Sequence, residues 1–78
     1  MPKAFVLINV ESGTEEQVLR DLKGVEGIEE AYYSYGVYDI ITKIQAATME
    51  SLKDTVTRNI RTLPNVRSTL TLIIVDTD

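Results

Sequence analysis

Residues 28–45 read Ile-Glu-Glu-Ala-Tyr-Tyr-Ser-Tyr-Gly-Val-Tyr-Asp-Ile-Ile-Thr-Lys-Ile-Gln, and this run determines how the chain is organised. Residues 28–35 and 38–45 are rich in β-branched and aromatic residues, which is typical of strands. Gly36 and Val37 separate the two runs, and glycine adopts the positive φ of a tight turn without steric cost. The run therefore predicts a β-hairpin at the centre of the chain.

A strand and a helix precede the hairpin. Residues 4–10, Ala-Phe-Val-Leu-Ile-Asn-Val, are apolar at both alternating sets of positions, which predicts a strand that is apolar on both faces. Thr14 and Gln17 have the spacing of a capping box at the start of a helix. Lys23 and Gly24 supply a cation and a glycine, which favour a helix end.

A helix and a strand follow the hairpin. Thr48 is the predicted N-cap of the second helix, and Leu63-Pro64-Asn65 ends it. The last strand is expected over residues 66–75, followed by a polar tail at residues 76–78. The second helix has apolar residues at spacings that define one face: Met49, Leu52, Val56 and Ile60.

The predicted order β-α-β-β-α-β is that of a ferredoxin-like α+β fold in one domain, residues 1–78. Right-handed crossovers place both helices on one face of a four-stranded antiparallel sheet, with the expected strand order 4-1-3-2. The other face would carry Phe5 and Leu7, or Ile73 and Val75. An apolar face of this kind predicts a dimer packed sheet to sheet, the alternative being a monomer with an exposed apolar sheet.

Composition narrows the function classes. The 78 residues include 12 acidic and 8 basic residues and neither cysteine nor histidine. Disulfides, thiolate metal sites and histidine catalysis are thereby excluded, so we predict no metal, no cofactor and no catalytic residue. A net charge of −4 argues against direct nucleic-acid binding. The N-terminal apolar run, interrupted at Asn9, is too short for a signal peptide or a membrane span, so we expect a cytoplasmic protein.

Two segments carry candidate binding groups. Asp39 closely follows the Gly36 turn, and a carboxylate beside an apolar strand is costly unless it is paired. Its partner is either a cation of the chain, Lys43 or Arg67, or a bound ammonium group. Glycine at the turn and tyrosines around it also have ordinary structural explanations, in backbone conformation and packing.

Thr69 and Thr71 form the second candidate, because alternate residues of a strand share one face. Their hydroxyls would bind a polar ligand, although β-propensity alone also explains a threonine pair. In the expected strand order, the first strand separates this pair from Asp39. A site that combines the two segments would then need a neighbouring subunit.

The motif Tyr-Gly-Val-Tyr-Asp-Ile-Ile at residues 35–41, together with Leu-Pro-Asn-Val-Arg-Ser-Thr-Leu-Thr-Leu at residues 63–72, resembles the effector-binding RAM domain of the Lrp/AsnC (feast/famine) transcription regulators. The resemblance extends over about residues 3–76. The regulators also carry a helix-turn-helix, which this sequence does not supply, so it resembles a stand-alone form of the domain.

The resemblance implies dimers formed by sheet packing, often rings of four dimers, and amino-acid effectors bound between dimers. By position, it implies ligand contacts at Tyr35, Gly36, Tyr38 and Asp39, and at the hydroxyls of Thr69 and Thr71. Full-length Lrp/AsnC regulators are implied partners. Two alternatives remain at this point, a small dimeric ferredoxin-like-barrel enzyme that uses Asp39 and tyrosines, and a purely structural oligomerisation module. The sequence does not name the effector.

Overall fold

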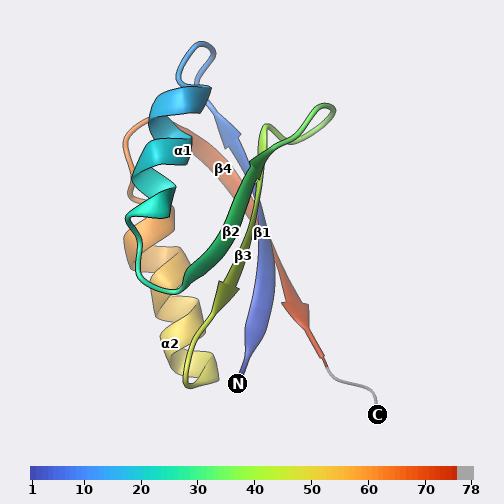
Figure 1. Cartoon of the computed structure of the whole chain (residues 1–78), viewed down its shortest axis with the longest axis vertical. Coiled ribbons are helices and arrows are strands. Elements are labelled where there is room, and N and C mark those ends of the chain that lie inside the picture. Colours follow the sequence, from blue (N-terminus) through green and yellow to red (C-terminus); the bar gives the residue numbers. More distant parts are fainter. Residues whose placement is uncertain (76–78) are drawn as a thin grey trace.

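The computed structural model describes residues 1–75 and has one four-stranded antiparallel sheet (Figure 1). The strand order β2-β3-β1-β4 confirms the expected order, read from the opposite edge. The predicted polar tail, residues 76–78, lies outside the described residues. The strands are β1 (Lys3–Val10), β2 (Ile28–Tyr33), β3 (Ile40–Gln45) and β4 (Val66–Ile74), and the helices are α1 (Glu15–Lys23), α2 (Met49–Asp54) and its π-helical continuation η1 (Thr55–Ile60).

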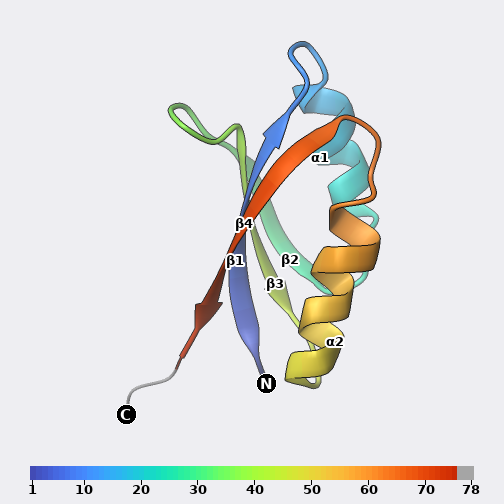
Figure 2. The ribbon, with the colours of Figure 1, turned by 180° about the vertical axis from the view of Figure 1, so that it is seen from behind.

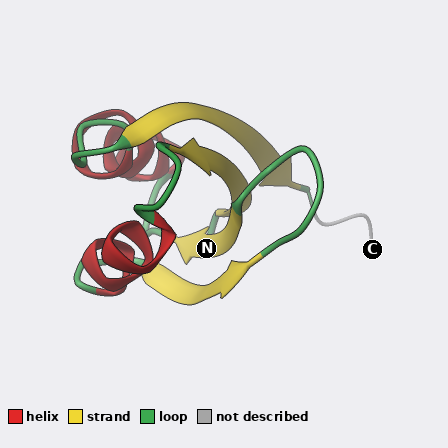
Figure 3. Cartoon of the chain, turned by 90° about the horizontal axis from the view of Figure 1, so that it is seen from above, coloured by secondary structure: helices red, strands yellow, loops and turns green. Residues whose placement is uncertain are grey.

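Both helices lie on the same side of the sheet, as Figure 2 shows from behind and Figure 3 shows from above. The sheet curves around them, and its other face is left open. The core therefore lies between the helices and the inner face of the sheet. Its buried apolar residues are Ala4, Val6, Ile8, Val10, Val18, Leu22, Ile40, Ile44, Leu52, Val56 and Ile60.

β1 lies between β3 and β4, and its inner residues contribute to the core. Val6 pairs with Thr42 on one side and with Thr71 on the other. Thr42 is fully buried, and its hydroxyl donates a hydrogen bond to the Val6 carbonyl at 3.2 Å. A buried hydroxyl with a partner avoids the cost of an unsatisfied polar group. This bond joins β3 to β1 on the helix side of the sheet.

The start of α1 differs from the predicted capping box. Thr14 occupies the N-cap position, but its hydroxyl donates backward to the Glu11 carbonyl at 2.6 Å. Its φ of −109° and ψ of 9° differ from the extended N-cap conformation that directs a side chain at the first turn. The Gly13 N–H is instead bound by the Glu15 carboxylate at 3.0 Å. The capping-box prediction with Gln17 is therefore wrong.

The second helix is capped as predicted and ends in a wider turn. The Thr48 side chain accepts a hydrogen bond from the Ser51 N–H at 3.0 Å. The Arg61 N–H donates to the carbonyl of Val56, five residues earlier, at 2.9 Å, which is the π-helical pattern. Met49, predicted on the buried face, is 41% exposed because it lies in the first turn of the helix, outside the core.

The pairing of β4 with β1 corrects the predicted open face. Ile73 pairs with buried Ala4 and so lies on the helix side of the sheet, where the sequence interpretation did not place it. Val75 lies beyond the last residue of β4. The register decides this, because a shift of one residue moves every side chain to the other face. On the open face, Phe5 and Leu7 are instead joined by Leu70, Leu72 and Ile74.

Candidate functional site

The loop between β2 and β3 projects from the sheet as a long tip (Figure 1). Its base is closed by the Ser34 N–H, which donates to the Asp39 carbonyl at 2.8 Å. The Asp39 N–H donates in turn to the Ile8 carbonyl of β1 at 3.0 Å. Gly36 has a φ of +128°, and a Cβ there would meet no atom within 4 Å, so conformation, not space, favours glycine.

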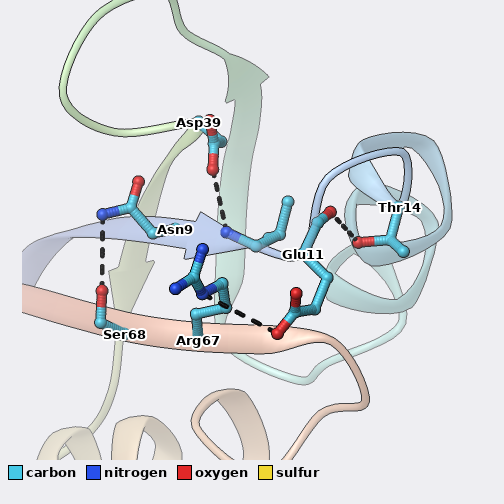
Figure 4. A network of polar contacts seen from close by, with 7 residues as sticks. Asn9, Glu11, Thr14, Asp39, Arg67 and Ser68 are labelled. Carbon is cyan, nitrogen blue, oxygen red and sulfur yellow. Dashed lines mark hydrogen bonds and ion pairs between the residues drawn. The ribbon is translucent and has the colours of Figure 1, made fainter.

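Asp39 is fixed at the end of β1 by its side chain as well as its backbone. Its Oδ2 accepts a hydrogen bond from the Val10 N–H at 2.9 Å (Figure 4). Neither predicted cation pairs with it among residues 1–75. Arg67 lies beside Glu11, with 3.8 Å between Nε and Oε1, and Lys43 is opposite Glu30 in the β2–β3 register. The backbone amide therefore orients the carboxylate without neutralising it.

Two open hollows meet at Asp39. The larger, of about 400 Å³, is lined by side chains from α1, β2 and the loop: Glu15, Glu16, Tyr33, Ser34, Tyr35 and Asp39. The smaller, of about 300 Å³, has Asn9, Val10, Arg67 and Ser68 around the same carboxylate. We name the larger one the acidic half-site, since three of its six lining residues are carboxylic acids. Glu16 is already paired with Arg20 at 3.2 Å. Among residues 1–75, Asp39 and Glu15 have no such basic partner, and they would attract a cation such as an ammonium group.

The tyrosines near the loop differ in position, since some line the acidic half-site and others do not. Tyr35 is fully exposed and lines the acidic half-site. Tyr38 is partly buried next to Asp39 and does not line that hollow. Tyr32 lies opposite Ile41 in the sheet and donates a hydrogen bond to Glu30 Oε1 at 2.7 Å. Of the four predicted loop residues, only Tyr35 and Asp39 therefore line the hollow directly.

The structure does not bring the threonine pair to Asp39 within one chain. Thr69 pairs with Ile8 and Thr71 with Val6, so both lie on the helix side of β4. β1 separates β4 from β3. This confirms the separation expected from the strand order.

Thr71 lines a second cavity, of about 340 Å³, between the second helix and β4. We name this cavity the helix–strand groove. Sequence reasoning missed it, although Lys53, Thr57 and Arg61 recur at the helical spacing of four beside the apolar stripe. The groove is lined by Leu52, Lys53, Val56, Thr57, Arg61, Thr71 and Ile73.

Two absences concern residues 1–75 only. In this part of the chain no three acidic side chains are gathered closely enough to hold a metal ion. No helix there has the length and apolar character needed to cross a bilayer.

A family model described as "Lrp/AsnC ligand binding domain" matches residues 3–77. The chain belongs to this family. The assignment agrees with the resemblance carried by residues 35–41 and 63–72, and it confirms the predicted family.

Relatives of this Lrp/AsnC domain are transcription regulators. The HTH-type transcriptional regulator FL11 of Pyrococcus abyssi is 35% identical over 74 residues, which is 95% of this chain and 48% of FL11. The chain thus spans about half the length of the curated relatives it matches.

Solved structures of the family show the same fold. FFRP-DM1 superposes with a TM-score of 0.92 at 35% identity, covering 96% of this chain and all of that one. E. coli AsnC gives a TM-score of 0.90 at 27% identity, covering 97% of this chain and 52% of AsnC. The domain is therefore similar both to a chain of its own size and to part of a larger regulator.

Proposed function

We propose that residues 1–78 form a single regulatory module that senses a small amino acid at sites between subunits, without catalysing a reaction. The observation that carries the proposal is Asp39, which is held by the Val10 amide and faces an open, acidic hollow. A carboxylate fixed in direction and left without a cationic partner suits recognition of an ammonium group. Membership of a ligand-binding family with regulator relatives supports the regulatory role.

The threonine pair can join the Asp39 loop only in an assembly. Gly36 and Tyr38 belong to the Asp39 loop, and Thr69 and Thr71 lie across β1 from it. We therefore propose that the acidic half-site of one chain faces the threonines of another. A heterologous contact of this type forms a ring when the rotation between copies closes, and the closed assembly proposed here is a ring of dimers such as an octamer.

The dimer itself is proposed to form through the open face of the sheet. Phe5, Leu70 and Leu72 are each more than a third exposed there, and Leu7 and Ile41 lie beside them. A chain of this size buries only about 60% of its unfolded surface alone, so covering this face adds needed stability. The same surface would admit full-length Lrp/AsnC regulators as partners, and we place the module in the cytoplasm with them.

Calorimetric titration with each of the twenty amino acids tests the proposal. At least one should bind the unmodified protein. Asp39→Asn should weaken this binding about ten- to a hundredfold, because loss of a charge-assisted hydrogen bond costs roughly 1.5–3 kcal/mol. Asp54→Asn is the matched control, since it removes the same charge from an exposed position on α2 that is remote from both hollows at Asp39.

Equal weakening by the two variants would show that only net charge matters, and it would overturn the role given to Asp39. Absence of binding by any amino acid would overturn the sensing function and would leave an oligomerisation module as the remaining interpretation.

A further inference from the structure

Two segments of the sequence have the composition of strands that stack with copies of themselves. Residues 4–10 and residues 69–75 contain no charge, no proline and no glycine, and both are rich in aliphatic residues. Short segments of high β-propensity and low charge are those that form cross-β assemblies, in which identical strands pair through their backbones. Composition alone does not decide which of the two is available for such pairing.

The order of the strands separates the two segments. β1, which contains residues 4–10, lies between β3 and β4 and pairs along both of its edges. β4 is the last strand of the sheet, and among residues 1–75 it pairs only with β1. Residues 69–74 of β4 therefore leave one row of backbone N–H and C=O groups without a strand partner. Together with Val75, which directly follows, we name them the edge segment.

The opposite edge of the sheet has features that discourage strand pairing, and the edge segment does not. β2 carries Glu29 and Glu30, and its pairing with β3 is irregular at the same place. Charges and bulges are the means by which natural edge strands avoid pairing with other chains. In β4 both the irregular pairing and the one charged residue, Arg67, lie at the start of the strand. The edge segment itself has neither.

Aliphatic side chains of the edge segment are exposed on both faces of the sheet. Leu70 and Leu72 are 42% and 48% exposed on the open face. Ile73 is 38% exposed on the helix side, where it lines the helix–strand groove, and Val75 is 73% exposed. A second strand added at this edge would therefore cover apolar surface on both faces in addition to pairing its backbone.

From these features we infer that the edge segment is a strand-pairing surface whose partner is the same segment of another copy, and that it directs cross-β self-assembly of the chain. Two copies repel one another on average, because each carries a net charge of −4. Stacking of identical edge segments brings only uncharged residues together, with leucine next to leucine and isoleucine next to isoleucine. This contact uses the backbone edge of β4, whereas the proposed dimer uses the side chains of the open face. The inference does not rest on the proposed function, since neither hollow at Asp39 includes a residue of the edge segment.

Thioflavin fluorescence of the agitated full chain, held just below its thermal unfolding transition, follows the assembly. Fibre diffraction of the product should show a strand spacing of about 4.7–4.8 Å. Val75→Lys should lengthen the half-time of assembly at least about tenfold, because a charge in every stacked copy repels its neighbours. Val37→Lys is the matched control, since Val37 is 81% exposed and lies outside the strands, in the loop between β2 and β3. It should change the half-time by less than about twofold.

A second variant places the charge inside the strand. Ile73→Lys lies on the helix side of β4, away from the open face, and should slow assembly to a similar extent. Any loss of stability in this variant would populate partly unfolded chains and accelerate assembly, so slower assembly is not explained by a failure to fold. Hydrogen exchange of the fibrils locates the protected core, which is expected at the edge segment.

Three outcomes would overturn the inference. Equal slowing by Val75→Lys and Val37→Lys would assign the effect to net charge. A protected core at residues 4–10 would show that assembly requires release of β1 from the sheet. Absence of fibrils from the unmodified chain, even in salt that screens the repulsion between copies, would show that the edge of β4 does not pair with copies of itself.

Discussion

Tyr32 and Glu30 form a hydrogen bond on the open face of the sheet, and this bond has a measurable consequence. The bond of 2.7 Å, the negative charge of Glu30 and partial desolvation together raise the pKa of Tyr32 above its usual value of about 10. The neutral phenol is the form that donates. Its contribution to stability is therefore present below about pH 10 and is lost as the pH rises through the folded pKa.

Replacing the acceptor should reverse the shift. Glu30→Gln is expected to lower the pKa of Tyr32 toward the usual value, since it removes the charge that opposes ionisation. Alkaline titration followed by NMR of the tyrosine ring resolves this residue from the other three tyrosines. Glu29→Gln is the control, because Glu29 makes no hydrogen bond to Tyr32 in the described structure. Equal shifts in the two variants would contradict the assignment to Glu30.

Single residues also show how far the site follows from sequence. The chemistry of Asp39 marks it as a candidate, but its partner, the Val10 amide, belongs to a strand 29 positions away in the chain. No local pattern contains that contact. Thr71 was identified as a hydroxyl on a strand, yet its neighbours in the helix–strand groove depend on how the second helix packs against β4.

Gly27 shows a constraint at the junction of two elements, α1 and β2. Its φ is +97°, and a Cβ there would lie 3.0 Å from the Gln45 carbonyl oxygen of β3. The Gly27 carbonyl also accepts a hydrogen bond from the Gln45 N–H at 2.9 Å, which holds the two strands at this distance. Both the conformation and the close approach disfavour a side chain at this position.

Gly27→Ala should therefore destabilise the fold more than the same substitution at a glycine whose surroundings leave room for a Cβ. Gly13 is that control, with a φ of +86° and no atom within 4 Å of a Cβ. Gly13→Ala is expected to cost about 1–2 kcal/mol from conformation alone, and Gly27→Ala should add a further cost of about 1 kcal/mol or more from the clash. Urea unfolding measures both, and equal losses would show that the Gln45 carbonyl moves away freely.

The type and order of the elements follow from sequence because their periodicities are strong. Alternation in residues 4–10 predicted the buried set of β1, and spacings of four placed Leu52, Val56 and Ile60 in the core. Bulges at Glu29 of β2 and Arg67 of β4 were not predictable, since each depends on pairing with another strand. The same reason accounts for the wrong face assigned to Ile73.

At the scale of the whole molecule, the apolar open face of the sheet predicts that two copies associate through it. Leu72 is 48% exposed and pairs with Phe5 on this face. Leu72→Lys should dissociate the proposed dimer, because burying an unpaired ammonium group in an apolar interface costs several kcal/mol. Light scattering coupled to gel filtration reports the molar mass.

The matched control is Met49→Lys, which introduces the same charge at a residue of similar exposure on α2. It should leave the mass unchanged. A monomeric unmodified protein at micromolar concentration, or a Leu72→Lys dimer, would contradict packing through this face.

The position of β1 between β3 and β4 also affects how the chain can fold during its synthesis. β1 leaves the ribosome first among the strands, but its partners β3 and β4 begin at Ile40 and Val66. The nascent chain must therefore expose at least one edge of an apolar strand until synthesis has passed the second helix, which invites chaperone binding or misassociation. Proteolysis of stalled nascent chains should show protection of β1 only after β4 has emerged. Protection of shorter chains would show that β1 and β3 suffice.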